Sequence, residues 1–142
     1  MFKHILLPTD GSKLSEKAVQ AGIKFAKSIN AKITAVYVVP KLKGVDVESL
    51  FPEKEYNKNL FQNAERYLEL IGRSAKAAKV NCETFYLTDS KPYKAIISAA
   101  QDCGCDVIFM ASHGRGGVAS LLLGSVTTRV LGHTKIPVIV YR

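Results

Sequence analysis

The chain has 142 residues, which is enough for one domain with a substantial hydrophobic core and too few for two ordinary domains. Hydrophobic residues make up 47% and charged residues 23% of it, and no apolar run approaches the length of a membrane span. The net charge is +8, but the basic residues are spread singly and are not interleaved with aromatic ones, which argues against nucleic-acid binding. We therefore expect residues 1–142 to form a single domain.

Five strand-like runs alternate with four helical patterns along the chain. The strands are expected at His4–Pro8, Ile33–Val39, Val80–Leu87, Asp106–Met110 and Ile136–Tyr141. The helices are expected at Leu14–Ile29, Leu60–Ala78, Pro92–Ala100 and Val126–Leu131, whereas Lys41–Glu55 shows no period and is expected to be a loop. This alternation predicts an α/β fold: one doubly wound, five-stranded parallel sheet with helices on both faces.

The cysteines and the N-terminus bear on the cellular compartment of the protein. The chain has three cysteines, Cys82, Cys103 and Cys105, and its N-terminus lacks the layout of a signal peptide. An odd number of cysteines without such a signal favours reduced thiols, so we expect a cytoplasmic protein. Because Cys103 and Cys105 are not spaced like zinc ligands, we expect a tight turn with buried thiols there.

Ligands of doubly wound sheets bind beyond the carboxyl ends of the strands, where the strand order reverses. Asp10 follows the first predicted strand, Val38 lies near the end of the second and Met110 ends the fourth. If the first and fourth strands are neighbours, these positions converge on one crevice. A lone aspartate before Gly11-Ser12 also fits a turn or a helix cap, so that alternative stays open for Asp10.

Two glycine-containing segments follow the fourth strand. Ala111-Ser112-His113-Gly114 is separated by nine residues from Gly124-Ser125, which opens the last predicted helix. Glycines let backbone N–H groups approach a ligand closely, and a helix N-terminus attracts anions, so the two segments together can hold a polyphosphate. Neighbouring side chains on a strand point to opposite faces, so we do not expect Ser112 and His113 to pair as nucleophile and base.

The last predicted strand, Ile136–Tyr141, is expected at an edge of the sheet, because Pro137 lacks a backbone donor. An uncovered apolar edge invites pairing with a second copy. We therefore expect a homodimer through Ile136–Tyr141.

The chain resembles the universal stress protein family, whose five-stranded α/β fold is of adenine-nucleotide-binding type. The resemblance rests on Pro8-Thr9-Asp10, on the nine residues between Gly114 and Gly124-Ser125, and on Lys135–Val140. These features span almost the whole chain, and it is their combination that is specific.

The resemblance implies a regulatory, stress-response protein that binds ATP, or ADP or AMP, with any magnesium held by the nucleotide and not by protein side chains. It implies adenine contacts from Asp10 and Val38, a slot shaped by Pro8 and Thr9, and base and ribose contacts from Met110 and Ala111. It implies phosphate contacts from Gly114, Arg115, Gly116, Gly117, Gly124, Ser125, Val126 and Thr127. Nucleotide binding is expected to order the segments 115–117 and 41–55 and so to signal to an unknown protein partner.

Ala111 departs from the family pattern, because it stands where the first signature glycine is found. If this position needs a positive φ, the methyl group costs about 1 kcal/mol, or roughly a fivefold loss of affinity. Two alternatives therefore stay open: a dimeric interaction module that binds no nucleotide, and a weak ATPase. No phosphate-loop motif with its lysine is present, and no catalytic residue is assigned.

Overall fold

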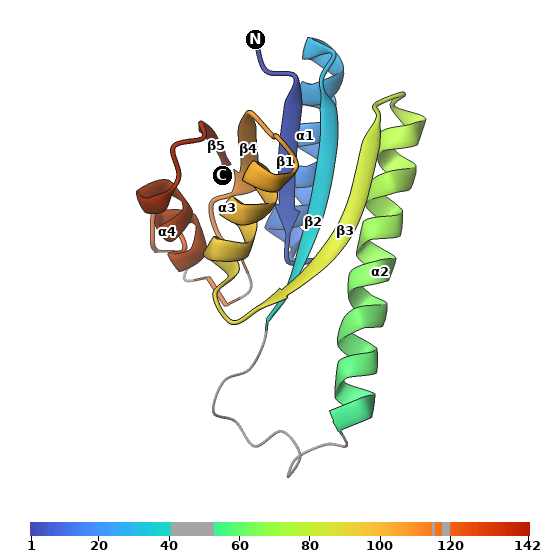
Figure 1. Cartoon of the computed structure of the whole chain (residues 1–142), viewed down its shortest axis with the longest axis vertical. Coiled ribbons are helices and arrows are strands. Elements are labelled where there is room, and N and C mark those ends of the chain that lie inside the picture. The colour runs from blue at the N-terminus through green and yellow to red at the C-terminus, as the bar shows by residue number, and fades with distance from the viewer. Residues whose placement is uncertain (41–52, 115, 118–119) are drawn as a thin grey trace.

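Five parallel strands in the order β3-β2-β1-β4-β5 form the sheet in the part of the chain that the structure describes (Figure 1). The structure is a computed structural model and describes residues 1–40, 53–114, 116–117 and 120–142. The strands are β1 His4–Thr9, β2 Lys32–Pro40, β3 Cys82–Asp89, β4 Val107–Ala111 and β5 Val138–Tyr141, and the helices are α1 Lys13–Ile29, α2 Glu53–Ala77, α3 Pro92–Asp102 and α4 Ser125–His133. None of these helices, over the ranges described, combines the length and apolarity needed to cross a membrane.

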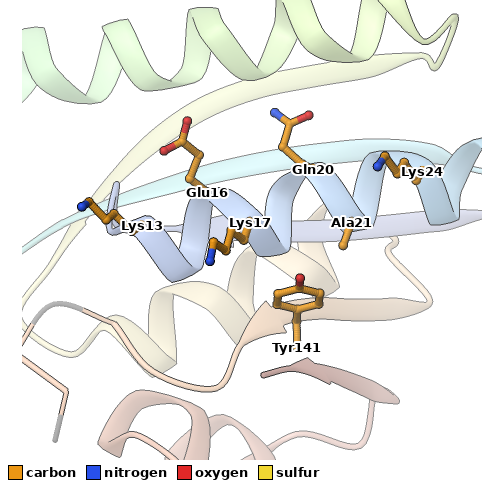
Figure 2. A pocket seen from close by; sticks show the side chains of 7 residues that line it. All are labelled: Lys13, Glu16, Lys17, Gln20, Ala21, Lys24 and Tyr141. Carbon is orange, nitrogen blue, oxygen red and sulfur yellow. The ribbon is translucent and has the colours of Figure 1, made fainter. Parts of the chain in front are cut away.

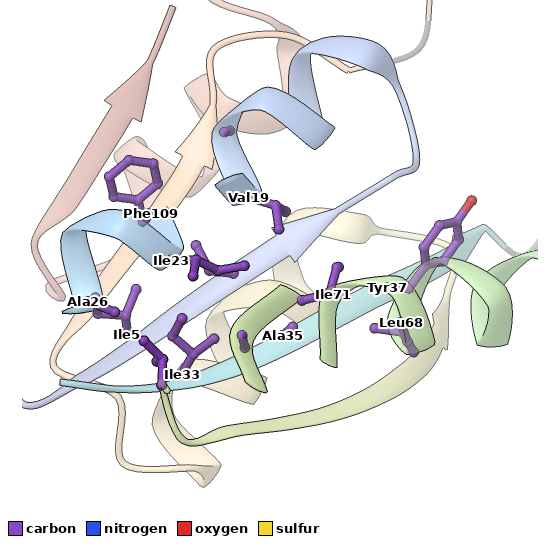
Figure 3. Packing of buried hydrophobic residues seen from close by; sticks show 14 of the residues in the cluster. Ile5, Val19, Ile23, Ala26, Ile33, Ala35, Tyr37, Leu68, Ile71 and Phe109 are labelled. Carbon is purple, nitrogen blue, oxygen red and sulfur yellow. The ribbon is translucent and has the colours of Figure 1, made fainter. Parts of the chain in front are cut away.

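The helices cover both faces of the sheet, which confirms the predicted α/β class. Helices α1 and α2 lie on one face, and α3 and α4 lie on the other (Figure 1). The central strand β1 is buried along its whole length, and its side chains alternate between the two faces. Ile5 packs under α1 and α2 (Figure 3), and Leu7 belongs to the same cluster, whereas Leu6 packs toward α3 and α4. This double burial explains why β1 reads as a continuous apolar run.

The sheet order places β1 beside β4, which confirms the neighbour relation on which the predicted ligand site depends. Ile5 pairs with Val107 and Leu6 with Ile108 in parallel register. On the other side, β1 pairs with β2 up to Thr9 opposite Tyr37. The strand order therefore reverses between β1 and β4, and their carboxyl ends lie at the same edge of the sheet.

Some element boundaries differ from the sequence-based expectation. Helix α2 already begins at Glu53, so the expected loop Lys41–Glu55 is too long, and residues 41–52 lie outside the described residues. Strand β5 begins at Val138 and not at Ile136. It does lie at the edge, because it pairs only with β4. Ladder pairing sets the limits of β5, and hydrophobic periodicity does not report it.

The three cysteines are free thiols, and burial raises the pKa of each above its ordinary value. The pKa of Cys82 rises to about 11 and that of Cys105 to about 12. Gly104 has a φ of +68°, which turns the chain sharply between Cys103 and Cys105 at the entry to β4. The expected tight turn is confirmed, and its thiols are poor nucleophiles at neutral pH.

A buried histidine at the start of β1 makes the stability of the fold depend on pH. Burial lowers the pKa of His4 below its usual 6.5, with a further contribution from the positive charge of Lys32. Its Nε2 forms a 2.7 Å hydrogen bond with Thr34 Oγ1. The unfolded chain therefore binds a proton more readily than the folded chain, so the contribution of His4 to stability is complete above pH 6.5 and is lost as the pH falls.

We expect the free energy of unfolding to decrease as the pH falls from about 7.5 to about 5.5, and His4→Gln to make this slope shallower. Urea denaturation of both proteins across this pH range measures the effect. His4→Gln removes only one of the titrating groups, so the difference between the two slopes isolates it. Parallel slopes in the two proteins would contradict the assignment.

Candidate functional site

Asp10 lies in the turn between β1 and α1. Its Oδ1 accepts a hydrogen bond from the N–H of Ser12 at 2.9 Å, and its backbone oxygen accepts one from the hydroxyl of Tyr37 at 3.0 Å. Ser12 in turn caps α1 by accepting from the N–H of Ser15. The turn role that the sequence left open is therefore present, while the cap is Ser12. The hydrogen bond from Tyr37 was not foreseen, because nothing local in the sequence connects β2 to this turn.

Thr9 and Pro8 end β1 as buried residues next to this turn. The Thr9 hydroxyl lies 2.6 Å from the hydroxyl of Ser15 and accepts from the N–H of Gly11 at 3.2 Å. Gly11 has a φ of +77°, which a residue with a side chain rarely adopts. The turn after β1 is thus held by its own side chains in one conformation.

The second half of the site follows β4, where Ser112 is tied on both sides by its backbone. Its N–H donates to the oxygen of Tyr141, and its oxygen accepts from the N–H of Gly124, each at 2.7 Å. The first bond continues the β4–β5 pairing, and the second fixes the start of α4 to the end of β4. We call the turn after β1, the segment Ala111–Gly114 and the first turn of α4 the β1–β4 site.

Helix α4 presents its N-terminus to this site without a capping side chain. The N-cap is Gly124, and the first turn holds no acidic residue. Ser125 is exposed, whereas Thr127 is buried and donates its hydroxyl to the oxygen of Ala111 at 2.9 Å. The first N–H groups of a helix have no partner within the helix, and its N-terminus carries a partial positive charge. The arrangement therefore suits an anion.

The glycines of the β1–β4 site stand where a side chain would not fit. A Cβ on Gly114 would collide with Asp10 Oδ2, and one on Gly124 would stand 3.1 Å from the oxygen of Ser112. A Cβ on Gly117 would stand 2.9 Å from the Cβ of His113. The backbone at these positions thus approaches neighbouring protein atoms closely, and we call these three glycines the glycine cradle. The N-terminus of α4, where Gly124 provides no capping side chain, is the feature that suits the phosphates of a nucleotide.

The side chain of His113 contacts that of Ser112, which was not expected from the sequence. Its Nδ1 lies 3.0 Å from the hydroxyl of Ser112, so the two side chains do pair. The rule of opposite faces holds within a strand, but the chain leaves β4 after Ala111 and bends at Ser112. Ser112 is only 2% exposed, and a buried hydroxyl of this kind is not placed to attack a substrate. The expectation that they would not pair is therefore wrong, although a nucleophilic pair still does not result.

Of the positions expected to contact the base, Val38 and Met110 lie on the face covered by α3 and α4. Val38 and Met110 are both buried in the cluster that includes Val130, and Val126 of α4 packs against the same cluster. They reach this face from β2, β4 and α4. The structure thus brings three of the expected side chains to one side of the sheet, near its carboxyl edge.

Ala111 has ordinary strand backbone. It is the last residue of β4, and the positive-φ residues other than glycine in the described chain are Asn30 and Lys79. Its side chain belongs to the cluster on the opposite face, under α1. The methyl group therefore carries no backbone strain, which removes the physical reason to expect weaker binding at this position.

Three of the expected phosphate contacts lie in the segment after Gly114. Arg115 is outside the described residues, so the structure gives no position for it. Gly116 and Gly117 are exposed, Gly116 has a φ of +71°, and the N–H of Gly117 donates to the oxygen of Gly114 at 3.3 Å. Over the described ranges, no group of three or more His, Cys, Asp or Glu side chains is placed to hold a metal ion.

A separate hollow of about 580 Å³ lies along the flank of α1 (Figure 2). It is lined by side chains of α1 from Lys13 to Lys24 and by Tyr141 of β5. None of these residues belongs to the expected nucleotide contacts. The hollow is therefore distinct from the β1–β4 site.

The sheet order, the crossover between β1 and β4 and the glycine cradle define an α/β protein of the doubly wound class. Comparison with known proteins gives the family. The family model described as "Universal stress protein family" matches residues 1–142. Universal stress protein MJ0531 of Methanocaldococcus jannaschii is 30% identical over 142 residues, which cover 100% of this chain and 83% of that protein. The chain belongs to the universal stress protein family.

Solved structures share the fold. That of MJ0577, also from Methanocaldococcus jannaschii, has a TM-score of 0.82 and 29% identity, and the match covers 99% of this chain and 95% of that one. A universal stress protein in complex with cAMP has a TM-score of 0.69 at 23% identity, covering 99% and 97% of the two chains. A universal stress protein from Archaeoglobus fulgidus in complex with dAMP has a TM-score of 0.66 at 17% identity, and the match covers 100% of this chain and 98% of that one. The last two, at this identity, show the fold alone.

The hydroxyl of Thr127 should contribute measurably to stability, because it is the buried donor that joins α4 to β4. We expect Thr127→Val to lower the free energy of unfolding by about 1–2 kcal/mol. Thr128→Val is the matched control: its hydroxyl donates to Gly124 within the same helix and is exposed, so its removal should change stability by less than about 0.5 kcal/mol. Urea denaturation measures both, and equal losses would contradict the assignment.

Proposed function

We propose that this protein binds an adenine nucleotide, ATP or its products ADP and AMP, at the β1–β4 site and acts as a regulatory module in a stress response. The observation that carries the proposal is the approach of two glycine segments to the end of β4, with the uncapped N-terminus of α4 beside them. A triphosphate is the kind of anion that such backbone donors hold. Any magnesium would arrive with the nucleotide.

The base would lie at the carboxyl ends of β1, β2 and β4. Asp10 and Val38 would contact the adenine, with Pro8, Thr9, Met110 and Ala111 around it. The phosphates would meet the backbone of Gly114, Gly116, Gly117 and Gly124 together with Ser125, Val126 and Thr127, and the side chain of Arg115 would balance their charge. Adenine nucleotides in the cAMP and dAMP complexes of proteins with this fold support the choice of base.

Two features of the described chain bear on the alternatives. The strand backbone of Ala111 gives no reason to favour a module without nucleotide. The odd number of cysteines, all three of them free thiols, agrees with a reducing, cytoplasmic setting, which we include in the proposal. A bound nucleotide would signal through the exposed segment that holds Gly116 and Gly117, to a protein partner whose identity is open.

Titration calorimetry with ATP, ADP and AMP, at concentrations up to about 1 mM, tests the proposal. We expect binding by the parent protein and at least about tenfold weaker binding by Gly124→Ala, because the added Cβ meets the backbone of Ser112 and His113, which cannot swing away. Gly132→Ala is the matched control: the same methyl group enters α4 where nothing lies within 4 Å, so its affinity should equal that of the parent.

Absence of heat with all three nucleotides would remove the proposed function. Equal affinities of the parent and Gly124→Ala would move the binding site away from the start of α4. Circular dichroism of both variants shows whether each keeps the parent fold.

We further propose that the protein forms a homodimer through β5. Among the strands that the structure describes, β5 pairs only with β4, so its other edge has no partner strand within these residues. The oxygens of Pro137 and Tyr141 face β4, since they accept from Ile108 and Ser112. Alternation along the strand therefore leaves the backbone groups of Val138 and Val140 on the outer edge, available to a second copy.

Sedimentation at micromolar concentration should give a dimer for the parent protein and a monomer for Val140→Pro. The substitution removes an N–H of the outer edge and leaves the hydrogen bonds to β4 in place. A monomeric parent, or a Val140→Pro variant that keeps both the fold and the dimer, would contradict pairing through this edge.

A further inference from the structure

His113 carries a polar atom that the fold leaves without a partner. Its Nε2 is shielded from solvent and has no hydrogen-bond partner in the described part of the chain. A buried polar group without a partner costs about 1–3 kcal/mol, and such groups in native proteins call for an explanation. The family assignment and the glycine cradle do not use this atom.

The ring of His113 lies close to both Gly117 and Gly124. A Cβ on Gly117 would lie 3.3 Å from its Cδ2, and a Cβ on Gly124 would lie 3.8 Å from the same atom. Cδ2 is bonded to Nε2 in the imidazole, so the edge of the ring that carries the unpartnered nitrogen borders both segments. This is the space that the proposed function gives to the phosphates.

The other ring nitrogen decides what Nε2 can do. Nδ1 lies 3.0 Å from the hydroxyl of Ser112, and that hydroxyl either donates to Nδ1 or accepts from it. If it donates, the ring proton of neutral His113 is on Nε2, which is then a donor without an acceptor. A phosphate oxygen is the acceptor that such a donor lacks.

We propose that His113 donates Nε2–H to a phosphate oxygen of the bound nucleotide, with the hydroxyl of Ser112 holding the required tautomer by donating to Nδ1. The inference rests on the proposed nucleotide binding. Gly117 is exposed and lies against the ring, so access of a phosphate to Nε2 requires Gly117 to shift and to give up the 3.3 Å hydrogen bond from its N–H to the oxygen of Gly114. His113 would thus contact the phosphates beside Gly117 and Gly124.

Nitrogen-detected NMR of the histidine rings, in ¹⁵N-labelled protein titrated with ATP and then with adenosine, tests this. The chain has three histidines, and the other two serve as internal references because their rings already have hydrogen-bond partners. His4 Nε2 is hydrogen-bonded to the hydroxyl of Thr34, and His133 Nδ1 to the backbone oxygen of Arg129. We expect the free protein to show His113 protonated on Nε2. ATP should shift this Nε2–H strongly, adenosine should not, and the references should stay unchanged.

The outcomes separate the inference from the function. If backbone signals of Gly114 and Gly124 respond to ATP while the ring of His113 does not, or if its proton is on Nδ1, the inference is wrong and nucleotide binding stands. If no signal responds to ATP, the proposed function fails and the inference with it.

A variant series gives a second readout. His113→Phe keeps a ring between Gly117 and Gly124 but has no nitrogen, so ATP should bind roughly tenfold to a hundredfold more weakly while the affinity for adenosine is unchanged. His113→Gln, which restores a side-chain donor, should recover part of the loss. Equal weakening of ATP and adenosine by His113→Phe would show that the ring acts through packing alone and would overturn the proposal.

Discussion

The two backbone hydrogen bonds of Ser112 are the constraint on which the rest of the site depends. They join the end of β4 to the last residue of β5 and to the N-cap of α4, each at 2.7 Å. Without the bond from Gly124, the start of α4 would have no fixed position relative to the sheet, and its unpaired N–H groups would point at no defined place. Thr127 reinforces the same junction from inside the helix. The N-terminus of α4 is therefore held against the sheet by these hydrogen bonds.

The sheet order turns this junction into a two-sided site. Because β1 is the neighbour of β4, the turn that holds Asp10 faces the segment that holds Gly114, and the two approach so closely that a side chain on Gly114 would collide with the carboxylate. Asp10 uses Oδ1 to order its own turn and presents Oδ2 to this second segment. Asp10 can therefore stabilise its own turn and also contact the proposed nucleotide, so these two roles do not exclude each other.

Much of this could be predicted from sequence, and the failures have physical causes. The fold class followed from β1 and β4, whose double burial leaves continuous apolar runs, and from the amphipathic α1. The limits of β5 did not follow, because its pairing with β4 decides them, and the start of α2 at Glu53 did not follow, because the first turns of this helix lack a clear apolar period. The pairing of Ser112 with His113 was missed because the alternation of side chains within a strand was assumed to extend to Ser112, which lies just beyond the end of β4. The backbone of Ala111 and the burial of His113 Nε2 depend on contacts with distant segments, which a single sequence does not display.

The central claim is that backbone amides on either side of the nine-residue spacer, those of Gly114 and of Gly124 with Ser125, enclose the phosphates of an adenine nucleotide. A crystal structure of the protein grown with ATP tests this most directly. The account predicts density for the phosphates beside these amides and for the adenine beside Asp10 and Val38. Nucleotide density in the hollow between α1 and Tyr141, with the glycine segments unchanged, would contradict it.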